Sequence, residues 1–129
     1  MKKILFICVE NSCRSQMAEG LALHMGEGIV EPYSAGSKPS GTVNPDAIKV
    51  MQEIGIGITN QKSKSFADLS IREFDYAITL GCQDICPFVP AHKHIEWNIP
   101  DPKGRSLDFF RKVRIQLGKK IEKLIKEIK

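Results

Sequence analysis

A short apolar run that leads directly into a polar loop constrains this chain more than any other feature. Residues 4–7 are apolar throughout, residues 8–15 form a polar segment, and residues 16–25 repeat apolar side chains with helical spacing. We therefore expect a strand, a loop and the start of a helix in that order. Such a loop directs backbone N–H groups and the positive end of the helix dipole toward one point. The segment therefore predicts a binding site for an anion at that point.

Two side chains of the loop fit this anion site. Arg14 carries a planar guanidinium that suits a tetrahedral oxyanion. Cys8 stands at the first position of the loop, where its sulfur can face the bound anion. A thiolate above an oxyanion is a nucleophile whose electrophile is already in position. The alternative is a buried cysteine at a strand end, but it would leave Arg14 and the polar loop without a purpose.

The composition predicts a globular protein with one domain over residues 1–129. Apolar residues make up 42% of the chain and charged residues 26%, which suffices for a substantial core. No apolar run approaches membrane-span length, and residues 1–3 lead into a strand without a signal-peptide pattern, so we expect a cytoplasmic protein without a membrane partner. The net charge of +4 suits an anionic substrate. Basic and aromatic residues are not interleaved, so we expect no nucleic acid partner.

The four cysteines form two close pairs, Cys8 with Cys13 and Cys82 with Cys86. In a cytoplasmic chain such cysteines are more often catalytic or metal-binding than structural disulfides. Their spacings are near those of four-cysteine zinc sites, so a zinc-binding module is one alternative. Arg14 argues against it, because a cation site would not include a guanidinium beside its ligands. We therefore expect no metal.

Strands and helices alternate along the chain. Apolar or alternating runs predict strands at residues 4–8, 29–34, 76–80 and 95–97, and helical spacing predicts helices at 15–25, 44–54 and 67–72 and from 106 onward. This order predicts a three-layer α/β fold with a four-stranded parallel sheet and helices on both faces. Ligands bind such sheets at the carboxyl ends of the strands. The loops that carry Cys8, Cys82 and Asp101 each follow a predicted strand and should meet there.

The segment from Asn11 to Gly20, with Cys8 ahead of it, resembles the thioredoxin-coupled arsenate reductases, which share a fold with low-molecular-weight tyrosine phosphatases. The similarity extends over nearly the whole chain. It includes Tyr33-Ser34-Ala35-Gly36, Asn44-Pro45, Asn60-Gln61, Thr79-Leu80, Cys86-Pro87 and Asp101-Pro102. The C-x5-R loop alone does not separate a reductase from a phosphatase. The additional Cys82 and Cys86 favour the reductase, and a low-molecular-weight protein tyrosine phosphatase is the main alternative.

The resemblance implies a complete reaction. Arsenate would bind the loop through N–H groups and Arg14, Cys8 would attack arsenic, and Asp101 would protonate the departing hydroxyl. Cys82 would then attack the Cys8 sulfur and release arsenite. Cys86 would take over the disulfide, which thioredoxin would reduce.

The resemblance also implies the remaining roles. Asn11 would shape the loop, Ser15 would stabilise the thiolate, and Cys13 would pack within the loop. No cofactor is expected, the protein would act as a monomer, and some phosphatase activity is compatible with this site. The residues that would surround an arsenate or phosphate-like oxyanion are Glu10, Asn11, Ser12, Cys13, Arg14 and Ser15.

The chain departs from the family pattern at three places. Glu10 replaces the usual glycine of the loop, and its carboxylate would repel an anion unless it points outward. Cys82 and Cys86 are closer in sequence than the corresponding family cysteines. If the segment between them is helical, it must partly unwind to form a disulfide. Lys64 falls where potassium-binding members carry a carboxylate, so we expect its ammonium group to replace that cation.

Overall fold

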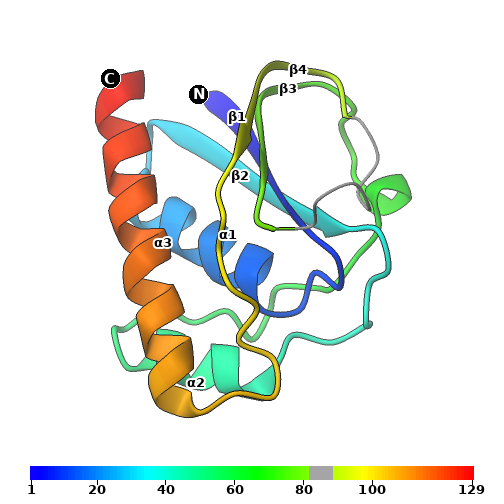
Figure 1. The fold of residues 1–129 in the computed structure, drawn as a ribbon. Coiled ribbons are helices and arrows are strands. Elements are labelled where there is room, and N and C mark those ends of the chain that lie inside the picture. The colour runs from blue at the N-terminus through cyan, green and yellow to red at the C-terminus, as the bar shows by residue number, and fades with distance from the viewer. Residues whose placement is uncertain (82–88) are drawn as a thin grey trace.

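The computed structural model describes residues 1–81 and 89–129, and a four-stranded sheet lies at its centre (Figure 1). All neighbouring strands are parallel, in the order β2-β1-β3-β4. The strands are β1 (Lys2–Cys8), β2 (Val30–Gly36), β3 (Phe74–Thr79) and β4 (Ala91–Glu96). Residues 4–8 of β1 are all buried, because this strand has a neighbour on each side and covered faces above and below. The predicted four-stranded parallel sheet is confirmed.

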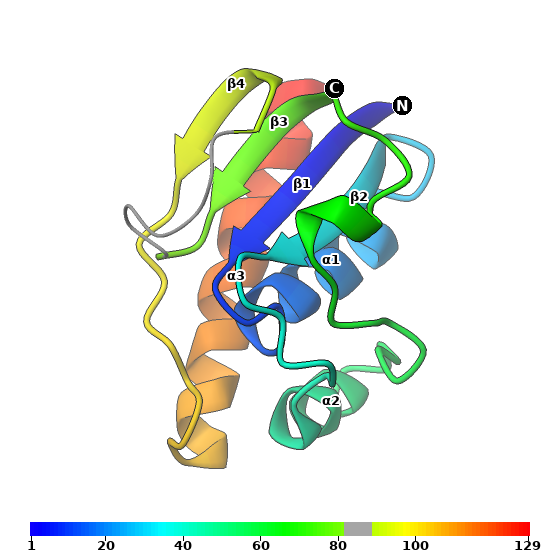
Figure 2. The ribbon, with the colours of Figure 1, turned by 90° about the vertical axis from the view of Figure 1, so that its right-hand side faces the viewer.

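Two α-helices, the first and the third in the chain, cover one face of the sheet, and the second packs against both of them (Figure 2). In chain order, the helices are α1 (Arg14–Met25), α2 (Pro45–Gln52) and α3 (Leu107–Ile128). Ile4 and Phe6, which alternate with Leu5 along β1, pack into their apolar cluster. The longest helix, α3, was predicted to begin near Ser106, and it begins at Leu107. Ser106 is its N-cap, and its side chain accepts a hydrogen bond from the Phe109 N–H.

The second face of the sheet is covered more thinly. Leu5 and Ile7 point to this side and pack in a cluster with Leu69 and Phe74. In the part of the chain that the structure describes, the helical element on this face is the short 3-10 helix η1 (Phe66–Asp68), which is drawn in front of the sheet in Figure 2. The helix expected at 67–72 is therefore shorter than predicted and begins slightly earlier.

Two differences in the elements have clear physical reasons. Strand β4 begins at Ala91 rather than near residue 95, because its backbone pairs with β3 while the side chains of residues 92–94 are exposed and show no alternation. The second helix, expected to reach residue 54, ends earlier, and Ile54 is 44% exposed. Helix α2 ends at Gln52, so Ile54 lies beyond the apolar stripe. No helix of the described ranges is both long enough and apolar enough to cross a membrane.

Candidate active site

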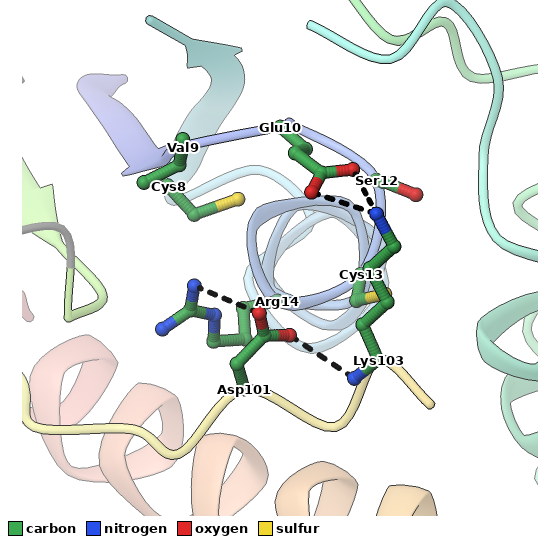
Figure 3. A pocket seen from close by; sticks show the side chains of 8 residues that line it. All are labelled: Cys8, Val9, Glu10, Ser12, Cys13, Arg14, Asp101 and Lys103. Carbon is green, nitrogen blue, oxygen red and sulfur yellow. Dashed lines mark hydrogen bonds and ion pairs between the residues drawn. The ribbon is translucent and has the colours of Figure 1, made fainter. Parts of the chain in front are cut away.

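The loop between β1 and α1 forms the floor of a small pocket (Figure 3). Cys8 is the last residue of β1, and Arg14 is the first residue of α1. The loop between them therefore joins the carboxyl end of the central strand to a helix N-terminus, where anions are favoured. A second loop, which follows β4, closes the other side. The lining residues are Cys8, Val9, Glu10, Ser12, Cys13, Arg14, Asp101 and Lys103.

Asn11 determines the shape of the loop. Its φ angle of 49° is left-handed, a conformation that asparagine tolerates better than most residues. The Asn11 side chain accepts a hydrogen bond from the Lys64 N–H at 2.9 Å and another from the Gln16 amide at 2.9 Å. It donates to the Ser15 Oγ at 2.7 Å. Because Asn11 is fully buried, these contacts hold the loop in one conformation.

Cys8 is buried, and its Sγ lies 2.8 Å from the Ser15 Oγ. The Ser15 oxygen already accepts a hydrogen bond from Asn11. Its own hydrogen is therefore available for donation to the sulfur. A thiolate is the nucleophilic form of cysteine.

The guanidinium of Arg14 is fixed by two backbone carbonyls. Its Nη1 donates to the oxygen of Leu80 at 2.6 Å and to that of Ile99 at 3.0 Å. These carbonyls follow β3 and β4, so the carboxyl ends of three strands meet at this group, as the alternating pattern predicts. The Arg14 Nη2 lies 3.8 Å from the Asp101 Oδ2. The Asp101 side chain is 52% exposed, so its carboxyl group is open to solvent at the pocket.

Glu10 does not carry an unpaired charge at the pocket. Both of its carboxylate oxygens accept hydrogen bonds from the Lys103 Nζ, each at 2.8 Å. Both side chains are solvent-accessible at the mouth of the pocket (Figure 3). The repulsion that Glu10 would exert on an anion is therefore balanced by the ammonium group of Lys103.

The comparisons with known proteins agree with this geometry. The sequence profile of the low molecular weight phosphotyrosine protein phosphatase family matches residues 3–129. The chain belongs to this family. It is 41% identical over 131 aligned residues to a glutaredoxin arsenate reductase of Synechocystis sp., with 99% of each chain covered. It is 42% identical over 125 residues to arsenate reductase 2 of Staphylococcus saprophyticus, with 94% of each chain covered.

Solved structures also resemble the whole chain. An arsenate reductase in the phosphate-binding state superposes with a TM-score of 0.89 at 40% identity, and the match covers 100% of both chains. The fold predicted from the resemblance is therefore confirmed. These relatives and this structure all bear arsenate reductase names.

The second cysteine of the loop has a different environment from the first. Burial, followed by the negative charge of Asp101, raises the pKa of Cys13 to about 12. The Cys13 thiol is therefore protonated at neutral pH and is a poor nucleophile. Cys8 and Cys13 are both free thiols. Cys82 and Cys86 lie outside the described residues, and no cluster of three or more metal-ligating side chains occurs in the described part.

Lys64 is enclosed in a group of oxygens. Its Nζ donates to the Ser34 Oγ at 3.2 Å and to the Lys62 carbonyl at 3.0 Å, and it lies 3.6 Å from the Glu19 Oε1. The side chain is 23% exposed. An ammonium group among these ligands occupies a position suited to a cation, and the Lys64 N–H simultaneously holds Asn11.

Two glycines of the site were not predicted from the sequence. A Cβ on Gly36 would lie 2.5 Å from the Val9 carbonyl oxygen and 2.8 Å from the Asn11 nitrogen. A Cβ on Gly81 would lie 2.7 Å from the Arg14 Nη1, and the φ angle of Gly81 is +90°. Gly36 thus allows β2 to approach the loop, and Gly81 makes room for the guanidinium. The available signal was a glycine at the carboxyl end of a strand, because Gly36 is the last residue of β2 and Gly81 lies two residues after β3.

Proposed function

We propose that this protein reduces arsenate to arsenite, with Cys8 as the nucleophile. The observation that carries the proposal is the convergence of Cys8, Arg14 and Asp101 on one pocket above a helix N-terminus. The arsenate reductase names of relatives at about 40% identity over nearly the full chain support the same activity. The family's phosphatase chemistry needs the same three residues, so the choice of arsenate rests on these relatives and on Cys82 and Cys86.

The oxyanion would bind the backbone N–H groups of the loop and the free edge of the Arg14 guanidinium. The phosphate-binding state of the similar structure supports a tetrahedral oxyanion as ligand. The Cys8 thiolate would attack arsenic, forming an S–As bond while one As–O bond breaks. Asp101, in its acid form, would donate a proton so that the departing oxygen leaves as water. The product is a Cys8–arsenic adduct that still contains As(V).

Reduction of arsenic would require a second thiol. The Cys82 thiolate would attack the Cys8 sulfur, forming a Cys8–Cys82 disulfide, and the electron pair of the S–As bond would remain on arsenic as arsenite. Cys86 would then attack Cys82 and return the Cys8 thiolate, leaving a Cys82–Cys86 disulfide. We propose thioredoxin as the dithiol that reduces this bond. A glutaredoxin is the competing reductant, because one relative bears that name.

We also propose that residues 1–129 form one domain that acts as a monomer. The site supports the single domain, because the pocket combines a loop near the start of the chain with one at residues 101–103.

The decisive experiment measures arsenate-dependent NADPH oxidation with two reducing systems. One contains thioredoxin and its reductase, and the other contains glutaredoxin, glutathione and glutathione reductase. Hydrolysis of an aryl phosphate is measured in parallel. We expect arsenate-dependent turnover in the thioredoxin system that disappears in Cys8→Ser. Aryl phosphate hydrolysis without arsenate-dependent oxidation in either system would instead establish the phosphatase.

A further inference from the structure

An ion pair joins the two loops at the mouth of the pocket. The Lys103 ammonium contacts both Glu10 carboxylate oxygens at 2.8 Å, although the residues are 93 positions apart in sequence. Glu10 belongs to the loop after β1, and Lys103 belongs to the loop after β4. Figure 3 shows the pair on the side of the pocket away from Arg14.

The pair lies within a group of charges that an incoming anion must pass. The Lys103 backbone N–H donates to the Asp101 Oδ1 at 3.1 Å, so this lysine is adjacent to both carboxylates of the pocket. The contact with Glu10 is also the main cause that raises the pKa of Lys103, so the lysine carries its charge at neutral pH. An anion at the pocket therefore meets a carboxylate and an ammonium whose fields largely cancel.

We propose that Glu10 and Lys103 act as a balanced pair that sets the oxyanion affinity of the pocket. Lys103 cancels the repulsion that the Glu10 carboxylate would exert on the anion. Glu10, in turn, occupies the ammonium group and limits its attraction for the anion. This inference rests on the proposed function insofar as it requires an oxyanion in the pocket. Both residues change the affinity for the oxyanion through their charge, and neither takes part in the chemical step.

The charge balance predicts opposite effects for the two single variants. Lys103→Met leaves the Glu10 carboxylate unpaired and should weaken oxyanion binding. Glu10→Gln releases the ammonium and should strengthen it. Each change should be roughly two- to fivefold, the range for exposed ion pairs. The double variant should return toward the wild-type affinity, and all differences should shrink at high ionic strength.

The test measures inorganic phosphate binding to the reduced full-length protein by titration calorimetry at low and high salt. Lys126→Met serves as the matched control, because Lys126 also pairs with an exposed glutamate, at 3.3 Å, on α3. It changes the net charge equally and should leave phosphate affinity unchanged. In the arsenate reductase assay, the two pocket variants should change KM in the same directions, with a smaller effect on kcat.

Three outcomes would overturn the proposal. Weaker phosphate binding in both single variants, without recovery in the double variant, would mean that the pair is only a mechanical link between the loops. Equal affinity in all variants would mean that the pair has no influence on the anion. If the wild type binds phosphate, neither of these two outcomes affects the proposed function. Absence of phosphate binding in wild type would overturn both proposals.

Discussion

The Ser15 Oγ lies 2.8 Å from the Cys8 Sγ, and the same oxygen accepts a hydrogen bond from the Asn11 side-chain amide at 2.7 Å. The hydroxyl hydrogen of Ser15 is thus free to point toward the sulfur. Ser15 is fully buried, so water cannot replace it in this arrangement. The nucleophile would therefore depend on a chain of two hydrogen bonds within the loop.

Ser15→Ala should slow arsenate-dependent turnover and the alkylation of Cys8 by iodoacetamide at neutral pH. A hydrogen bond to a charged group contributes about 1.5–3 kcal/mol, so we expect a loss of roughly tenfold or more. Alkylation kinetics with peptide mapping measure the effect on Cys8 directly. The exposed Ser70 provides the control, and Ser70→Ala should react like wild type. Equal alkylation rates in all three proteins would mean that Ser15 does not activate the thiolate.

The two cysteines of the loop should respond differently to replacement by serine. Cys8→Ser should abolish arsenate reduction and any phosphatase activity, because a hydroxyl is a far weaker nucleophile than a thiolate. Cys13→Ser should retain measurable activity, because the raised pKa keeps this thiol protonated. Steady-state assays of both reactions distinguish the variants. Retention of more than a few per cent of either activity in Cys8→Ser would remove Cys8 from the mechanism.

Local sequence signals predicted much of this fold. The apolar run at 4–7 gave the central strand, Asn44-Pro45 gave the start of α2, and the periodicity after Ser106 gave α3. Each of these signals lies within one segment of the chain. The four-strand alternation then predicted that the loops of Cys8 and Asp101 would meet, whereas the Cys82 loop lies outside the described residues.

Contacts between distant segments could not be predicted in the same way. The pairing of Glu10 with Lys103 depends on how two loops approach each other, so the sequence alone suggested repulsion at Glu10. Gly36 and Gly81 are needed because backbone or guanidinium atoms of other segments come close. Strand β4 gave little signal because its exposed side chains do not alternate. The tertiary structure determines all four features.

Potassium should leave the stability and turnover of the wild type nearly unchanged, because the Lys64 ammonium lies among the oxygens that would hold the cation. Thermal midpoints in sodium and potassium at equal ionic strength should agree. Lys64→Met should destabilise the fold by about 1–3 kcal/mol, because Glu19 loses its charged partner in a partly buried position and keeps the hydrogen bond from the Ser34 hydroxyl. A potassium-specific rise in the wild-type midpoint that grows with concentration would show a functional cation site.

A cluster between α2 and α3 should make stability depend on acid pH. Hydrogen bonds from Arg111 and then Arg114 lower the pKa of Glu53 to about 2. A carboxyl group with a depressed folded-state pKa stabilises the protein above its unfolded pKa, near 4.5, and loses that effect as pH falls toward 2. The wild type should therefore melt above Glu53→Gln at pH 6–7, and this difference should vanish toward pH 2. Because Glu53 is exposed, the difference should also shrink with added salt.

Thermal melts across this pH range, with Glu127→Gln as the control, measure the contribution of Glu53. Glu127 lies exposed near the end of α3, away from the arginine cluster. A difference between wild type and Glu53→Gln that stays constant from pH 7 to pH 3 would contradict the assignment to ionised Glu53.

The order of the thiol steps can be tested by trapping them. Cys82→Ser should stop the reaction at the Cys8–arsenic adduct, because no thiol remains to release arsenite. Cys86→Ser should release one equivalent of arsenite and stall with Cys8 bonded to Cys82, because Cys86 is needed only to regenerate Cys8. Acid quench followed by peptide mapping identifies each trapped bond, and arsenite is quantified in the same samples.

The short separation of Cys82 and Cys86 makes this experiment a test of the cascade itself. The two cysteines are four positions apart, and in a helix such residues have Cβ atoms about 5–6 Å apart, whereas a disulfide needs about 3.5–4.5 Å. Formation of the Cys82–Cys86 bond therefore requires a non-helical conformation of this segment. A Cys8–Cys86 disulfide at full single-turnover yield in Cys82→Ser would reverse the proposed order. Cys86 would then be the thiol that reaches the Cys8 adduct first.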